Sequence, residues 1–148
     1  LDENTGFAGI TLIKTSGQHG RPKVLEDMKA LLGEVSGVVF KHPDEKTFYI
    51  AGDTVWCQAV EDNLKKYHPD IVVLNSCDAQ VIGNESIIMG KQDIYEVYKA
   101  APEATVIASH MEAVNHATLT RKELRGFLSE KGMTQRVLVP EDGESYTF

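Results

Sequence analysis

The chain has 148 residues, of which 42% are apolar and 25% are charged, so its composition is that of an ordinary globular domain and not of a disordered or fibrous protein. Its 22 acidic residues outnumber its 15 basic residues, which gives a formal charge of -7. Because binding to a phosphate backbone relies on clustered Lys and Arg, we expect no nucleic-acid partner. The densest basic stretch contains Arg121, Lys122 and Arg125, is interrupted by Glu123, and is interpreted as a solvated helix face.

Length, cysteine content and hydropathy predict a single cytoplasmic domain spanning residues 1–148. A chain of this length buries enough surface to hold its own core, so a metal ion would serve chemistry and not folding. Cys57 and Cys77 form no CxxC pair, which favours a reduced cytosolic setting. No apolar run approaches the ~20 residues of a membrane span, and the first residues lack the pattern of a secretory signal, so we expect no membrane partner.

Strand patterns come first along the chain. Short apolar and β-branched runs predict strands over 10–14, 35–40 and 47–51. The segment His42-Pro43-Asp44-Glu45 between the last two runs is typical of a hairpin turn. The N-terminal third is therefore predicted to contain an antiparallel pair.

From Trp56 onward, helix and strand patterns alternate. Apolar residues at helical spacing, with Pro, Gly and capping signals at their ends, predict helices over 56–67, 94–101 and 120–131. Thr120 and Glu123 have the spacing of a capping box in the third helix. Apolar runs predict strands over 71–74, 105–108, 137–139 and 146–148. The predicted fold class is α/β, with a β-hairpin followed by αβ units.

Three predicted strands are each followed by a potential metal ligand. His19 follows the first strand, Asp53 follows the third in Gly52-Asp53-Thr54, and His110 follows the strand over 105–108. Imidazole and carboxylate are ligands that zinc takes where a coordination position stays open for water. Each residue also has a structural interpretation: His19 as a turn residue in a Gly-rich loop, and Asp53 as a helix N-cap.

Taken together and in this order, Gly17-Gln18-His19-Gly20, Gly52-Asp53-Thr54 and Ser109-His110 resemble the second half of the metallo-β-lactamase superfamily. More narrowly, they are similar to the metal-dependent hydrolases related to ascorbate-6-phosphate lactonase. The resemblance implies that the chain is the C-terminal half of a four-layer αββα sandwich. It also implies that His19 binds a first metal ion, Asp53 bridges two ions, and His110 binds the second.

The cofactor implied by this resemblance is zinc, with two ions in a complete site and manganese or iron as alternatives. Two such ions lower the pKa of a bridging water, so that hydroxide is present at neutral pH and can attack an ester, a lactone or a phosphodiester. The function implied is a metal-dependent hydrolase of a small cytosolic substrate: a lactone, a phosphate ester or an amide.

The chain departs from the superfamily pattern because it contains no His-x-His-x-Asp-His motif. Its five histidines are His19, His42, His68, His110 and His116, and no two of them are separated by a single residue. We therefore expect the chain to be the C-terminal part of a longer protein, or to receive its missing half from another chain. Alone, it is expected to bind metal weakly, to be inactive, and to expose an apolar sheet face through which it self-associates. A homo-oligomer is expected.

Other residues and functions remain open at this point. His116 could orient a metal ligand or contact substrate, while helix capping and solvent exposure are equally compatible with its position. Cys77 has no neighbouring base in the sequence and is interpreted as a packed thiol. The alternative function is a non-catalytic doubly wound α/β binding or signalling domain, although Asn75 stands where a receiver domain would carry its phosphorylated Asp. A further alternative is a degenerate hydrolase fold kept as a binding module.

Overall fold

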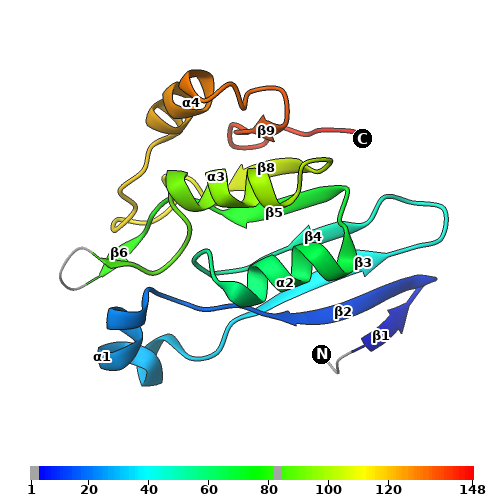
Figure 1. Ribbon diagram of the computed structural model, residues 1–148, viewed down its shortest axis with the longest axis horizontal. Helices are drawn as coiled ribbons and strands as arrows, with labels where there is room; N and C mark the ends of the chain where they lie inside the picture. The colour runs from blue at the N-terminus through cyan, green and yellow to red at the C-terminus, as the bar shows by residue number, and fades with distance from the viewer. Residues whose placement is uncertain (1–3, 82–84) are drawn as a thin grey trace.

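The computed structural model describes residues 4–81 and 85–148 and forms one mixed sheet with helices packed against it (Figure 1). The sheet has the strand order β1-β2-β3-β4-β5-β8-β9. These strands are β1 (Asn4–Phe7), β2 (Ile10–Ser16), β3 (Ser36–Lys41), β4 (Phe48–Ile50), β5 (Ile71–Asn75), β8 (Thr105–Ser109) and β9 (Val137–Leu138). A separate small sheet pairs β6 (Gln80–Val81) with β7 (Glu85–Ser86). The helices are α1 (Pro22–Leu32), α2 (Gln58–Tyr67), α3 (Lys91–Ala100) and α4 (Arg121–Glu130).

The pairing changes from antiparallel to parallel at β4. The β1–β2, β2–β3 and β3–β4 pairs are antiparallel, whereas β4–β5, β5–β8 and β8–β9 are parallel. This confirms the predicted order of a β-hairpin followed by αβ units. It also makes the alternative of a doubly wound signalling domain wrong, because such a domain would be parallel from its first strand.

The predicted helices are all present, with shifted ends. α2 begins only at Gln58, so Trp56 precedes the helix that it was predicted to start, and α3 begins three residues earlier than its first predicted apolar residue. α4 has the predicted capping box: the Thr120 hydroxyl accepts a hydrogen bond from the Glu123 amide, and the Glu123 carboxylate accepts one from the Thr120 amide. No helix in the described part of the chain is long and apolar enough to cross a membrane.

Three features differ from the sequence-based expectations. The helix α1 and the edge strand β1 were not predicted, and the strand predicted over 146–148 is wrong, because these residues have no strand partner in the structure. Tyr146 and Phe148 are 39% and 49% exposed. Tyr146 and Phe148 are residue types that favour strands, but no neighbouring strand pairs with this segment, so it does not form one.

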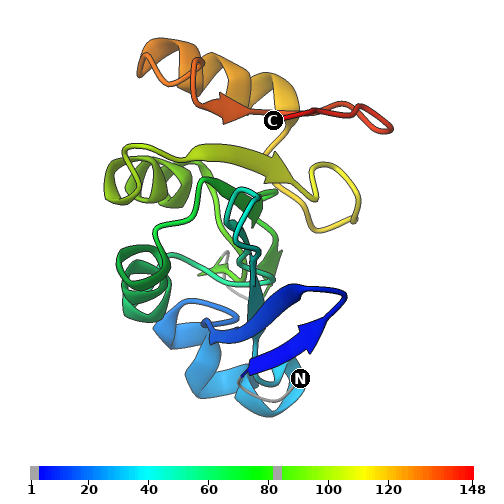
Figure 2. The same ribbon diagram turned by 90° about the vertical axis from the view of Figure 1, so that its right-hand side faces the viewer.

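The two faces of the sheet differ in how they are covered. On one face, register places Val39, Tyr49, Val72 and Val106 side by side, all of them 0% exposed. Figure 2 shows α2 and α3 along this side of the sheet, and their buried side chains close the core there. These helical core residues are Val60, Leu64, Ile94 and Val97.

The opposite face carries an apolar row that runs across five strands. Register aligns its members one beside the next, and they are Val38, Ile50, Val73, Ile107 and Leu138. Ile50 is 36% exposed and the other four are only half-buried. This face is thus less buried than the opposite one, but only Ile50 of its apolar row is exposed, so the expectation of an exposed apolar sheet face is met in part.

Candidate functional site

The predicted ligands follow strands that end at the same edge of the sheet. β2 and β4 are each antiparallel to β3, so they run in one direction, and β5 and β8 are parallel to β4. His19, Asp53 and His110 come shortly after β2, β4 and β8, respectively. Asn75 is the last residue of β5, between the strands that precede Asp53 and His110. Side chains at the carboxyl ends of such strands are the usual position for function in α/β folds.

The His19 loop and the Asp53 loop are joined directly. The Gln18 amide donates a hydrogen bond of 2.8 Å to Thr54 Oγ1, and the Val55 amide donates one of 2.9 Å to the Gln18 carbonyl oxygen. A Cβ on Gly17 would lie 2.8 Å from Thr54 Oγ1, a distance that real Cβ atoms essentially never show. Glycine at this position therefore allows the two loops to approach each other.

Asp53 is not a helix cap, which removes its structural interpretation. The N-cap of α2 is Cys57, four residues later. The Asp53 Oδ1 atom instead accepts a 2.6 Å hydrogen bond from Asn75 Nδ2, at the end of the neighbouring strand. Gly52 has a φ of +76°, and a Cβ there would lie 3.0 Å from the Ser36 carbonyl oxygen. The turn that presents Asp53 thus requires a glycine in front of it.

His19 is fixed through one ring nitrogen. Its Nδ1 lies 3.3 Å from the carbonyl oxygen of Leu32, the last residue of α1. Because a carbonyl oxygen only accepts, Nδ1 carries the proton in this contact, and the lone pair of the neutral ring is then on Nε2. This arrangement is typical of a metal-binding histidine whose other nitrogen is held by the protein.

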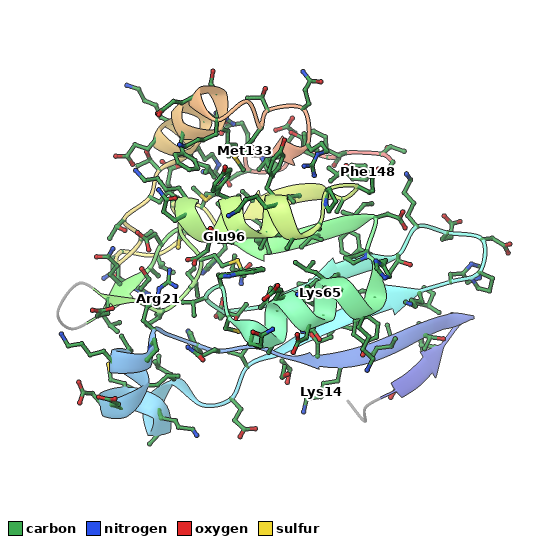
Figure 3. The ribbon with its side chains drawn as sticks, viewed as in Figure 1. Lys14, Arg21, Lys65, Glu96, Met133 and Phe148 are labelled. Carbon is green, nitrogen blue, oxygen red and sulfur yellow. The ribbon has the colours of Figure 1, made fainter. Side chains whose placement is uncertain are left out.

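An ion pair anchors the end of the His19 loop. The Arg21 guanidinium lies 2.7 Å from both carboxylate oxygens of Asp93 in α3, and the Asp93 side chain is only 5% exposed. The Arg21 amide also donates to the carbonyl oxygen of Ser86 in β7. Figure 3 shows Arg21 beside α1, on the side facing β6. The loop that carries His19 is thus attached to elements far away in sequence.

His110 lies beside a cavity of about 270 Å³. The cavity lies between the loop after β8 and the segment 140–144, and Arg121 also contributes to its wall. The Arg121 side chain is only 13% exposed, so its assignment to a solvated helix face is wrong. Arg121 is the first residue of α4, and a cation in the first turn of a helix opposes the helix dipole. This unfavourable position is the feature of the sequence that could have indicated a role for Arg121 other than solvent exposure.

His116 lies farther along the same loop and is exposed. Its Nδ1 lies 3.1 Å from Asn115 Oδ1, and its carbonyl oxygen accepts a hydrogen bond from the Gln80 amide in β6. Neither contact involves His19, Asp53 or His110. The predicted role of His116 next to a metal or substrate stays a prediction.

The three predicted ligands follow strands that end at the same edge of the sheet, but the structure does not gather them into one group. Two imidazoles and a carboxylate suit zinc chemically. Within residues 4–81 and 85–148, however, no three His, Cys, Asp or Glu side chains are grouped so that they could hold a metal ion. The described part of the chain therefore offers donors that fit a metal in kind, but not a full coordination shell.

No protein-family model matches the chain. A curated relative, UPF0173 protein YddR of Bacillus subtilis, is 56% identical over all 148 residues. The chain spans 57% of the length of that relative.

The solved structures that resemble this chain are also longer than it. An isothiocyanate hydrolase from Delia radicum gut bacteria is 46% identical with a TM-score of 0.95, over 100% of this chain and 58% of the other. A possible metal-dependent hydrolase from Veillonella parvula is 41% identical with a TM-score of 0.96, over 99% of this chain and 57% of the other. A metallo-β-lactamase fold protein of Bacillus subtilis, YhfI, shares only 12% identity but has a TM-score of 0.66, over 97% of this chain and 50% of the other. The chain therefore has the fold of the C-terminal half of the metallo-β-lactamase superfamily.

Proposed function

We propose that this chain supplies part of the metal centre of a metal-dependent hydrolase, with His19, Asp53 and His110 as its ligands. The observation that carries the proposal is their common position after β2, β4 and β8 at one edge of the sheet, with the first two loops hydrogen-bonded to each other. Of the two relatives with closely similar structures, one is an isothiocyanate hydrolase and the other is described as a possible metal-dependent hydrolase. His116 is proposed to contact substrate or to orient a ligand from the same edge.

The remaining ligands come from outside these residues. The described residues contain no group of three donors that could hold a metal ion. His19, Asp53 and His110 alone therefore leave each metal ion short of the four or more ligands that it needs. The relatives are longer than this chain, which spans 57% or 58% of their lengths. Residues 1–148 are thus proposed to be one domain-sized part of a larger fold, completed by an N-terminal half or by another chain.

The chain's own residues hold and orient the donors. The Leu32 carbonyl oxygen fixes the His19 tautomer, and the Asn75 amide holds one oxygen of Asp53. Zinc bound there, or manganese or iron in its place, would lower the pKa of a water molecule and polarise the bond to be hydrolysed. Orientation of the ligands by such hydrogen bonds sets how well the metal is held.

The proposed substrate is a small cytosolic molecule. The excess of acidic residues disfavours long polyanions, which leaves lactones, phosphate esters and amides. Isothiocyanates join this group because a protein 46% identical over the whole chain is an isothiocyanate hydrolase. All of these substrates share an electrophilic centre that water can attack.

The test uses the complete polypeptide that contains this chain. His19→Ala, Asp53→Ala and His110→Ala are each compared with the unsubstituted protein for zinc content and for hydrolysis of a panel containing a lactone, a phosphate ester, an amide and an isothiocyanate. Each substitution is expected to lower metal content and to reduce activity by at least about a hundredfold, because a metal ligand is lost.

The matched control is His42→Ala. His42 lies in the turn between β3 and β4, at the opposite edge of the sheet, where its Nδ1 accepts a hydrogen bond from the Asp44 amide. This variant is expected to keep its metal and its activity. If all three edge variants also keep their metal, the proposal is wrong and a binding module without catalysis becomes the better interpretation.

A further inference from the structure

Arg121 joins three segments that are distant in sequence. Its Nη1 donates a 2.7 Å hydrogen bond to Glu112 Oε2, and its Nε donates one of 2.9 Å to the Pro140 carbonyl oxygen. Its Nη2 donates to the Asp142 carboxylate. The first of these partners lies two residues after His110. Arg121 thus connects the start of α4 both to the His110 loop and to the segment after β9.

The His110 loop adopts a conformation that needs such support. His110 and Glu112 both have a φ of +57°, in the left-handed region that side-chain-bearing residues rarely adopt. Strained residues persist only where the surrounding structure holds them. Met111 between them is 4% exposed and is anchored in the core, while the Glu112 carboxylate is held by Arg121.

Arg121 itself has little freedom. Its side chain is 13% exposed, and a third carboxylate, that of Glu141, lies 3.8 Å from its Nε. A guanidinium bonded in several directions has a fixed position and can serve as a rigid support. The Glu112 carboxylate is therefore bound to a guanidinium that the segment after β9 also holds, through the Pro140 carbonyl oxygen and the Asp142 carboxylate.

We propose that Arg121 is a positioning residue that holds His110 in its left-handed conformation through the Glu112 carboxylate. The proposal rests on the proposed function, because it assigns Arg121 to the support of a metal ligand. Arg121 does not touch the metal or the substrate in this role. Its loss affects the site through the backbone of residues 110–112.

The structure offers a matched control on the same helix. Arg125, one turn later in α4, donates a 2.7 Å hydrogen bond to the Val139 carbonyl oxygen and pairs with Glu141 at 2.7 Å. Arg121 and Arg125 thus both hold the segment after β9, but only Arg121 binds Glu112. A general role in holding the chain end would make the two arginines equivalent.

The experiment measures zinc affinity by competition with a chelator in the complete polypeptide, and amide hydrogen exchange at residues 110–112 in its metal-free form. Arg121→Ala is expected to raise the zinc dissociation constant about tenfold and to accelerate exchange at 110–112. Glu112→Ala removes the same contact without altering α4, and it is expected to raise the zinc dissociation constant and to accelerate exchange at 110–112 to the same extent. The double variant is expected to raise the zinc dissociation constant no further than Arg121→Ala alone, because each single substitution already removes the contact between Arg121 and Glu112. Arg121→Lys is expected to recover part of the affinity, and Arg125→Ala to change neither quantity.

The outcomes separate this proposal from the proposed function. If Arg121→Ala and Arg125→Ala behave alike while His110→Ala still weakens zinc binding, the positioning role is wrong and the metal site stands. If His110→Ala leaves zinc binding unchanged, the proposed function fails and the positioning role fails with it.

Discussion

At the scale of single residues, Asn75 orients the Asp53 carboxylate. Its amide holds Asp53 Oδ1 at 2.6 Å from the neighbouring strand. Asn75→Ala in the complete polypeptide is expected to raise the zinc dissociation constant by about ten- to a hundredfold, because the carboxylate loses the bond that orients it. Chelator competition measures this change.

The control for Asn75 is Gln58→Ala. Gln58 is also a side-chain amide, but it lies at the surface of α2, where it donates 2.9 Å to Asp62 Oδ1. Its removal is expected to leave zinc affinity unchanged. Equal affinities for the Asn75 variant and the unsubstituted protein would show that Asp53 needs no such orientation.

The two cysteines differ in their exposure, and their reactivity follows from it. Cys77 is 0% exposed, and burial raises the pKa of its thiol, so the thiol stays protonated at neutral pH. Cys57 is partly exposed at the start of α2. Alkylation of the folded protein, followed by peptide mass analysis, is expected to label Cys57 first and Cys77 only after unfolding. Labelling of Cys77 in the folded state would contradict the packed-thiol interpretation.

Sequence patterns could identify His19, Asp53 and His110 as candidates because each follows a strand within a few residues. They could not identify the contacts that hold these residues. Glu112 and Asp142 lie 9 and 21 residues from Arg121, and Asn75 lies 22 residues from Asp53. Such pairs depend on how strands are ordered in the sheet, and no local pattern encodes that order.

At the scale of elements, α4 shows a stabilising device that is entirely local. The Thr120 hydroxyl accepts from the Glu123 amide at 3.2 Å and donates to the Glu123 carboxylate at 2.7 Å. Thr120→Ala is expected to lower the free energy of unfolding by about 1 kcal/mol, since a helix N-cap is lost. Urea denaturation measures this, with the exposed Thr134→Ala as a control that removes a hydroxyl without a capping role.

The capping box should also depend on pH. The Thr120 hydroxyl, followed by the Thr120 amide, lowers the pKa of the Glu123 carboxyl below its ordinary value of 4.5. A lowered pKa in the folded state stabilises the fold above the unfolded-state pKa, and this contribution disappears as the pH falls through the folded-state value. The stability difference between the unsubstituted protein and Glu123→Ala is therefore expected to be larger at pH 7 than at pH 3. A difference that does not change with pH would rule out the ionised carboxylate as the stabilising form.

Elements with local signals at both ends could be predicted from the sequence, and elements defined by tertiary contacts could not. α4 has a capping box at its start and Lys131-Gly132 at its end. α1 was missed because its apolar residues do not form one buried face: Val24 is buried, whereas Leu31 is 78% exposed. β1 exists through its pairing with β2, while its own Phe7 is 73% exposed.

At the scale of the whole molecule, one face of the sheet is covered by helices and the other carries an apolar row that no helix covers in the described part of the chain. α2 and α3 bury one face, and the apolar row Val38, Ile50, Val73, Ile107 and Leu138 crosses the other. The proposed ligands lie in the loops at the sheet edge where β2, β4 and β8 end, and this edge borders both faces. If the proposed additional half covers the apolar row, it also reaches the sheet edge that is followed by His19, Asp53 and His110, so one segment would supply both the cover and the remaining ligands.

This arrangement predicts how the 148-residue chain behaves when it is prepared alone. A contiguous apolar face in water favours association, so the isolated chain is expected to form dimers or larger species in sedimentation velocity experiments. Ile50→Glu places a charge on the most exposed residue of the apolar row and is expected to shift the population towards monomer. Leu31→Glu is the matched control, because Leu31 is more exposed, at 78%, but lies on α1 and outside the row. A monodisperse monomer of the unsubstituted chain, or an equal effect of the two substitutions, would show that the apolar row does not drive the association.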